Sequence, residues 1–268
     1  MLIDTHAHLN FSAYKNDTNE VTQRSLKNNV WMINVGSQYS TSKKAVEIAE
    51  KYFQGVYAAI GLHPIHAQDG FKKEEYQKLA QSKKVVAIGE IGLDYKVEYL
   101  FFKKKQKEIF LEQLDLAKKL NLPVIFHCRM AHQNLIEILK SQIQNYKSQT
   151  NSKFKIQNSK LRGVIHCFTG NWKEAEQYLE MGFYLGFNGI IFKLNLDEII
   201  KKTPINKILL ETDCPYLTPP EFIQQRNEPL SVKYIAEKVA KIKNLSFNEI
   251  VIKTTQNAKT LFTQAFIK

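Results

Sequence analysis

Two histidines lie two positions apart near the beginning of the chain, in the stretch LIDTHAHLNF of residues 2–11. On a β-strand, residues i and i+2 point to the same face, so His6 and His8 would direct both imidazoles into one small volume. Imidazole is among the commonest metal ligands in proteins. Taken alone, the pair fits either half of a metal site or two surface histidines on a frayed terminus.

Further titratable side chains accompany apolar, β-rich runs along the chain. His63 follows VYAAIGL, Glu90 falls near the end of VVAIGEI, and His127 falls near the end of PVIFHC. His166 lies in GVIHCF, and Asp213 ends KILLETD. Five of the seven histidines are therefore expected at the carboxyl ends of strands. Buried structural histidines explain one or two such placements but not the whole set, so the sequence favours a metal site.

Eight short apolar runs alternate with longer segments of helical period, which predicts the elements that position these residues. The runs are 2–6, 30–36, 56–62, 85–91, 123–128, 163–168, 182–188 and 207–213. They favour an α/β fold, a (β/α)8 TIM barrel that forms a single domain over residues 1–268. A doubly wound open sheet is the alternative, because strand counts from sequence are imprecise.

The segments between the runs predict helices. Ser40 or Ser42 is expected to cap one that runs to residue 53, and another covers 102–121. A third ends at Gly182, and two more follow from residue 231 to close the outer ring. Residues 141–162 are polar and of low complexity, so we expect a long, mobile surface excursion there.

Composition narrows the class of protein. The net charge of +12 favours a polyanion such as nucleic acid, although a general bias towards Lys, Asn and Ile explains it equally well. The three cysteines show no CxxC spacing and cannot all pair, which fits a reducing, cytoplasmic setting. No signal peptide and no apolar run of membrane-spanning length is recognised. We expect no membrane association, no obligate protein partner and a monomer.

In a barrel, the carboxyl ends of the strands meet on one face, so residues far apart in the chain become neighbours. Imidazoles and carboxylates bind Zn²⁺, Mn²⁺ and similar ions, and a pair of ions needs a bridging carboxylate. Glu90 is the expected bridge. Asp213, beside the first strand, could both ligate a metal and accept the proton of an attacking water. Glu211, two residues earlier, is either a support for a ligand or a buried structural carboxylate.

An ordered series of motifs extends this pattern over nearly the whole chain and resembles the TatD family of metal-dependent deoxyribonucleases, which are amidohydrolase-type TIM barrels. The motifs are IDTHAHLNF, AAIGLHP, AIGEIGLDY, PVIFHCR, GVIHCFTGN, LGFNGIIFK, LLETDCPYLTP and QRNEP. The resemblance implies metal contact at the six residues that the strand-end argument selects, namely His6, His8, Glu90, His127, His166 and Asp213. It also implies hydrolysis of phosphodiester bonds in DNA, typically as a 3′→5′ exonuclease. The expected cofactors are two divalent ions, either Mg²⁺, Mn²⁺ or Zn²⁺, with Glu90 and Asp213 as the catalytic residues.

Four further residues could bind substrate or reach the site. His63, in a GxHP motif, would contact a phosphate or orient a ligand, or else bond to its own loop. The planar guanidinium of Arg129 suits a phosphate, with a structural salt bridge as the alternative. Arg226 and Asn227 could reach the site from the loop after the eighth strand, or could fix that loop in place.

The sequence also departs from the family pattern. Met130 and Gln133 stand where acidic residues are usual after the HxR of the fifth strand, and Asn188 replaces a small hydroxyl residue. The segment 141–162 is longer than the usual connection. None of these changes removes an expected metal ligand. DNA is the expected substrate, with RNA left open. The alternatives are a hydrolase of a small amide, lactone or aminoacyl ester, and a non-catalytic nucleic-acid binder.

Overall fold

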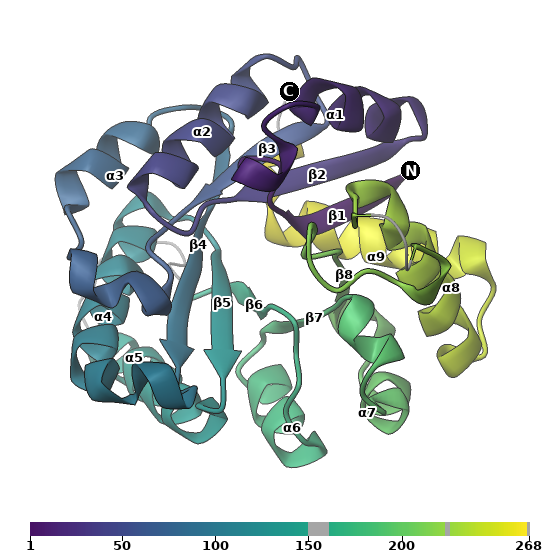
Figure 1. The fold of residues 1–268 in the computed structure, drawn as a ribbon. Coiled ribbons are helices and arrows are strands. Elements are labelled where there is room, and N and C mark those ends of the chain that lie inside the picture. Colours follow the sequence, from purple (N-terminus) through teal and green to yellow (C-terminus); the bar gives the residue numbers. More distant parts are fainter. Residues whose placement is uncertain (150–160, 223–225, 267–268) are drawn as a thin grey trace.

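A computed structural model describes residues 1–149, 161–222 and 226–266 of the chain. Eight parallel strands form one sheet in the order of the sequence, with helices around the outside (Figure 1). The strands are β1 (Leu2–Ala7), β2 (Val30–Val35), β3 (Val56–Ile60), β4 (Val85–Asp94), β5 (Val124–Arg129), β6 (Gly163–Ile165), β7 (Tyr184–Phe187) and β8 (Ile208–Leu210).

Backbone hydrogen bonds close the ring between β1 and the segment that directly follows β8. Asp213 N–H donates to His6 O at 2.8 Å, and His8 N–H donates to Cys214 O at 2.9 Å. Below them, the buried carboxylate of Asp4 accepts from the backbone and hydroxyl of Thr212. The predicted (β/α)8 barrel is therefore confirmed, and a doubly wound open sheet is excluded.

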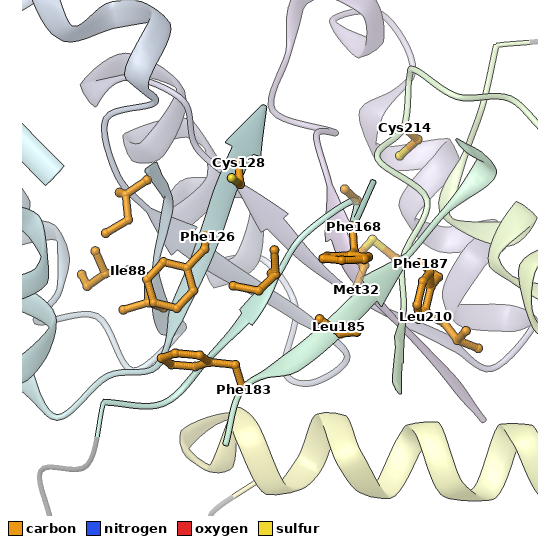
Figure 2. Packing of buried hydrophobic residues seen from close by; sticks show 14 of the residues in the cluster. Met32, Ile88, Phe126, Cys128, Phe168, Phe183, Leu185, Phe187, Leu210 and Cys214 are labelled. Atoms are coloured by element: carbon orange, nitrogen blue, oxygen red, sulfur yellow. The ribbon is translucent and has the colours of Figure 1, made fainter. Parts of the chain in front are cut away.

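Two apolar clusters hold the barrel together. The smaller one draws side chains from all eight strands, with α9 and the residues that follow it completing the cluster, as expected for the interior of a barrel. The larger one lies between the strands and the surrounding helices. There the rings of Phe126 and Phe183 pack edge to face with their centroids 5.2 Å apart (Figure 2).

The helices occupy the segments that the periodicity predicts. They are α1 (Thr18–Lys27), α2 (Tyr39–Glu50), α3 (Lys73–Leu79), α4 (Lys103–Leu120), α5 (His132–Gln149), α6 (Trp172–Glu180), α7 (Asp197–Lys202), α8 (Val232–Lys243) and α9 (Phe247–Leu261). Gly182 follows α6 with φ +91°, as a helix-stopping glycine should. The two C-terminal helices are confirmed. No helix within the described part of the chain is long and apolar enough to cross a membrane.

Two local expectations were wrong. The prediction that Ser40 or Ser42 caps α2 fails because the helix begins at Tyr39, and the Thr41 hydroxyl accepts from the Gln38 N–H instead. The expected excursion at 141–162 fails for its first part, because α5 continues to Gln149. That stretch contains no proline or glycine to stop the helix. The remaining residues 150–160 lie outside those that the structure describes.

The strand bounds differ from the predicted runs mostly by one or two residues, but three strands, β4, β6 and β8, end three residues away from their predicted carboxyl ends. β6 and β8 end early because Cys167 (φ +45°) and Asp213 (φ +56°) adopt left-handed backbone conformations that leave the strand direction. β4 instead runs on to Asp94 and pairs with β5 as far as Arg129. Gly92 permits this close pairing, since a Cβ there would lie 2.0 Å from His127 O.

Candidate metal centre

The candidate metal ligands lie together at the carboxyl ends of the strands. His6 and His127 belong to β1 and β5, His166 directly follows β6, and Asp213 lies three residues beyond β8. Glu90 lies inside β4, four residues before its end. A cleft of about 550 Å³ opens above them, and His6 is fully buried. Its lining includes seven residues that the sequence predicts: His8, His63, Glu90, His127, Arg129, His166 and Asp213.

The Glu90 carboxylate lies at the centre of the cluster and faces four imidazoles. Its Oε1 lies 2.5 Å from His127 Nδ1, 3.4 Å from His63 Nε2 and 3.7 Å from His166 Nε2. Its Oε2 lies 3.4 Å from His6 Nε2. Each oxygen thus faces a different set of ring nitrogens, which is what a carboxylate shared between two ions requires.

A second group forms where β1 meets the segment after β8. His6 Nε2 and His8 Nε2 are 3.1 Å apart, and Asp213 Oδ1 lies 3.8 Å from the first and 3.2 Å from the second. Three sets of ligand atoms each fall within 4.8 Å of one another: His6, Glu90 and His166; His6, His8 and Asp213; and His63, Glu90 and His127.

The hydrogen bond of His8 tests whether these residues suit a cation. Its Nδ1 lies 2.8 Å from Val35 O, which can only accept, so Nδ1 carries the proton. The Nε2 of a neutral His8 ring then presents a lone pair to the Asp213 carboxylate. Two electron-rich atoms in contact repel each other unless a proton or a cation lies between them. The buried donor set therefore fits a divalent metal ion, with a carbonyl that orients the His8 ring.

Glu211 orients another ring. Its Oε1 lies 2.8 Å from His166 Nδ1, so His166 Nε2 faces Glu90 and Asp213. The same oxygen accepts from the Cys167 N–H at 2.7 Å and from Asn188 Nδ2 at 3.1 Å. Asn188, one of the departures from the family pattern, thus helps to hold the carboxylate that contacts His166. These contacts match the supporting role that the sequence left open for Glu211.

Asp94 is a member of the cluster that the sequence analysis missed. It is buried, lines the cleft, and its Oδ2 lies 3.1 Å from His127 Nε2. His127 is therefore held between two carboxylates, with Glu90 at Nδ1 and Asp94 at Nε2. The strand period offered the necessary signal, because Glu90, Gly92 and Asp94 alternate along one strand and share a face.

Opposing effects set the charge states of these groups. Burial lowers the pKa of His166, but Glu211, Glu90 and Asp213 outweigh it and raise that pKa to about 10. Burial likewise lowers the pKa of His127, and Glu90 and Asp94 raise it to about 9. Burial raises the pKa of Glu90, but the surrounding imidazoles hold it well below its usual range. Without a bound metal at pH 7, His127 and His166 are thus imidazolium ions beside the ionised Glu90 carboxylate.

Metal uptake is therefore expected to release protons and to tighten as the pH rises. An ion that takes a nitrogen of His127 or His166 must displace a proton, since both pKa values lie above 7. Affinity should rise by about tenfold per displaced proton for each pH unit and level off near the pKa of about 9 to 10. Calorimetric titration in two buffers of different ionisation enthalpy counts the protons. A pH-independent affinity with no proton release would contradict this assignment.

His63 differs from His127 and His166 in its charge state. Burial and the neighbouring His127 lower its pKa to about 4, so it is neutral at pH 7. Its Nδ1 accepts from the Ile65 N–H at 3.2 Å, which leaves the proton of the neutral ring on Nε2, towards Glu90 and the cleft. His63 can therefore act as a hydrogen-bond donor at the cleft wall.

The structure separates the two candidate arginines. Arg129 is exposed and lines the cleft, and its guanidinium makes no ion pair or hydrogen bond with a described side chain. Arg226 lies away from the lining residues, with Nη2 2.5 Å from Asp17 Oδ2 and its guanidinium 4.0 Å from the centre of the Tyr14 ring. These contacts match the loop-fixing alternative for Arg226, and its role in substrate binding stays a prediction.

Asn227 likewise has the contacts of a loop-fixing residue. It is fully buried, and its side-chain amide donates to Thr212 O at 3.2 Å and to Tyr216 O at 2.6 Å. Its Oδ1 accepts from the Glu228 N–H and from the Ser231 hydroxyl. Asn227 therefore ties the segment that carries Asp213 to the start of α8.

Comparisons with known proteins agree with this geometry. The model of the family described as TatD related DNase matches residues 3–263. The metal-dependent hydrolase YabD of Bacillus subtilis is 41% identical over 268 residues, which cover 98% of this chain and 99% of YabD. The 3′-5′ ssDNA/RNA exonuclease TatD of Erwinia tasmaniensis is 32% identical over 272 residues, which cover 97% of this chain and 99% of that exonuclease.

A solved structure gives the same result. The crystal structure of YJJV, a TatD homologue from Escherichia coli K12, superposes with a TM-score of 0.83 at 29% sequence identity, and the match covers 98% of both chains. The sequence, the fold and the cluster of imidazoles and carboxylates thus agree. The chain belongs to the TatD family of metal-dependent hydrolases.

Proposed function

We propose that this hydrolase is a nuclease that cleaves phosphodiester bonds in single-stranded DNA or RNA from the 3′ end. The observation that carries the proposal is the Glu90 carboxylate, which faces four imidazoles in a cleft. The same cleft is lined by Arg129, whose guanidinium makes no ion pair or hydrogen bond with a described side chain. The name of the Erwinia tasmaniensis relative, a 3′-5′ ssDNA/RNA exonuclease, supports the substrate class.

Six residues would hold two divalent ions, either Mg²⁺, Mn²⁺ or Zn²⁺: His6, His8, Glu90, His127, His166 and Asp213. Such ions, when bound, polarise a phosphoryl oxygen and lower the pKa of a water. Glu90 would be shared between them, because its two oxygens face different rings. Glu211 and Asp94 keep His166 and His127 in position.

Asp213 would accept the proton of the attacking water. Burial raises the pKa of its carboxyl group, but the neighbouring imidazoles, His166 foremost and His6 with it, outweigh burial and lower that pKa, so the group is ionised at neutral pH. Its side chain lines the cleft and is 16% exposed, so water in the cleft can reach it. A positioned carboxylate of this kind typically contributes about 10²–10⁴-fold to a rate.

Arg129 and His63 would bind the substrate phosphates. The free guanidinium of Arg129 offers two parallel donors to a phosphate. His63 adds a neutral N–H donor, with its Nε2 3.4 Å from Glu90 Oε1. The floor of the cleft therefore combines groups that hold metal with groups that bind anions.

The decisive test is the product ladder from end-labelled single- and double-stranded DNA and RNA, incubated with metal-reconstituted protein. We expect single strands to shorten stepwise from the 3′ end, and EDTA to abolish the ladder. A hydrolase of a small amide or lactone would leave every strand intact while hydrolysing a model ester or lactone. A non-catalytic binder would cleave no strand. It would still retard the strands in a gel mobility assay, both in the presence of EDTA and as the Asp213→Ala variant.

A further inference from the structure

Tyr216 is an exposed aromatic residue at the edge of the cleft that neither the metal centre nor the fold accounts for. It lies three residues after Asp213 and lines the cleft, and the residue is 55% exposed. Its ring centroid lies 6.5 Å from that of the His8 ring, at an angle of 69°. One exposed aromatic ring is common on protein surfaces, so its meaning depends on how it is held and what surrounds it.

The backbone of Tyr216 is fixed although its ring is free. Its N–H donates to Asp213 O at 3.0 Å, and its carbonyl oxygen accepts from the buried Asn227 amide at 2.6 Å. Two residues earlier, Cys214 O accepts from the His8 N–H, which ties the segment to β1. The ring therefore projects from a rigid support beside the metal centre. A flat surface held in this way loses little conformational entropy when a ligand packs against it.

A second aromatic surface lies across the cleft. The segment Val97–Phe102 follows β4 and contains Tyr99, which lines the same cleft, and Phe101, which is 93% exposed. In a ring of eight strands in sequence order, β4 and β8 lie opposite each other. Tyr99 and Tyr216 thus line one cleft together with Glu90 and Arg129, in segments that follow opposite strands of the ring.

This combination matches the chemistry of a nucleotide. The floor offers metal ligands and Arg129 for a phosphate, and the edge offers a flat π-surface for a base. We propose that Tyr216 stacks on the base of the nucleotide next to the scissile phosphate, and this assignment rests on the proposed nuclease function. A base inside a duplex is paired and stacked on its neighbours, so only an unpaired end presents a free face. Because every base has such a face, the contact would be insensitive to sequence.

The test compares Tyr216→Ala, Tyr216→Phe and wild type on two single-stranded oligonucleotides, one intact and one abasic at the 3′-terminal positions. On the intact strand, Tyr216→Ala should lower kcat/KM about tenfold or more, mainly through KM, the effect typical of a lost base stack. Tyr216→Phe should retain the wild-type value, since the ring remains. On the abasic strand, Tyr216→Ala and wild type should be equal. Phe53 is 96% exposed and lies just before β3, at the opposite end of the barrel. Phe53→Ala should therefore leave kcat/KM unchanged on both the intact and the abasic strand.

Different failures are distinguishable. The stacking assignment would be overturned if Tyr216→Ala lowered kcat/KM equally on intact and abasic strands. It would also be overturned if Tyr216→Phe lowered kcat/KM as much as Tyr216→Ala does. Metal content measured on each variant checks that the centre is intact, and a Tyr216→Ala protein that lost metal would equally overturn it in favour of a structural role. A wild-type protein that cleaves neither strand would refute the proposed nuclease function itself.

Discussion

Asp213→Asn is expected to lower kcat for strand cleavage by about 10²–10⁴-fold, the range for removal of a positioned general base. The amide has nearly the shape of the carboxylate but cannot accept the water proton. The backbone contacts that place the residue do not involve its side chain, because Asp213 N–H donates to His6 O and Tyr216 N–H donates to Asp213 O. Nucleic-acid affinity should therefore stay nearly unchanged.

Single-turnover cleavage and equilibrium binding, measured on the same oligonucleotide, test this expectation. Asp115→Asn, which changes an exposed aspartate on α4, is the matched control and should behave as wild type. Because Asp213 is also a proposed metal ligand, the assay is repeated with excess metal. Full recovery at high metal would show that the residue serves only as a ligand, and undiminished turnover would remove it from the mechanism altogether.

Glu90→Gln is expected to have the second large effect, on metal content. The carboxylate supplies the negative charge that faces His6, His63, His127 and His166. An amide supplies no charge and turns an N–H group towards at least one of these rings. Metal affinity should fall by more than about 100-fold, the upper end of the loss seen when a residue that merely orients a ligand is removed. Cleavage should fall with it.

Elemental analysis after dialysis measures the effect directly. Wild-type protein should retain close to two divalent ions per chain, and Glu90→Gln fewer than one. Glu237→Gln, at an exposed position on α8, should retain the wild-type content. A Glu90→Gln protein that still holds two ions would show that Glu90 is not shared between them. Loss of the proposed bridge should also lower the pKa of His127, because Glu90 is the largest of the contributions that raise it.

The sequence predicted the features that depend on local periodicity and on ordered motifs. Strand alternation placed His6 and His8 on one face, and the eight apolar runs predicted the barrel whose closure brings them near Asp213. The six candidate ligands consequently lie together as expected. Such predictions succeed because a strand or a helix imposes its period on neighbouring residues, whatever the rest of the chain does.

Only the tertiary structure decided how partners distant in the chain pair. His127 is held by Asp94, His166 by Glu211, and Arg226 by Asp17, and none of these pairings follows from a local period. β4, β6 and β8 also end at residues other than those that the apolar runs predict. Left-handed backbone conformations at Cys167 and Asp213 end β6 and β8 early, and Gly92 lets β4 continue. The candidate role of Tyr216 in base stacking likewise depends on the fold, because the distant Asn227 fixes its backbone beside the cleft. The physical reason is that side-chain contacts between strands arise only when the sheet closes, and the sequence period says nothing of which side chains then meet.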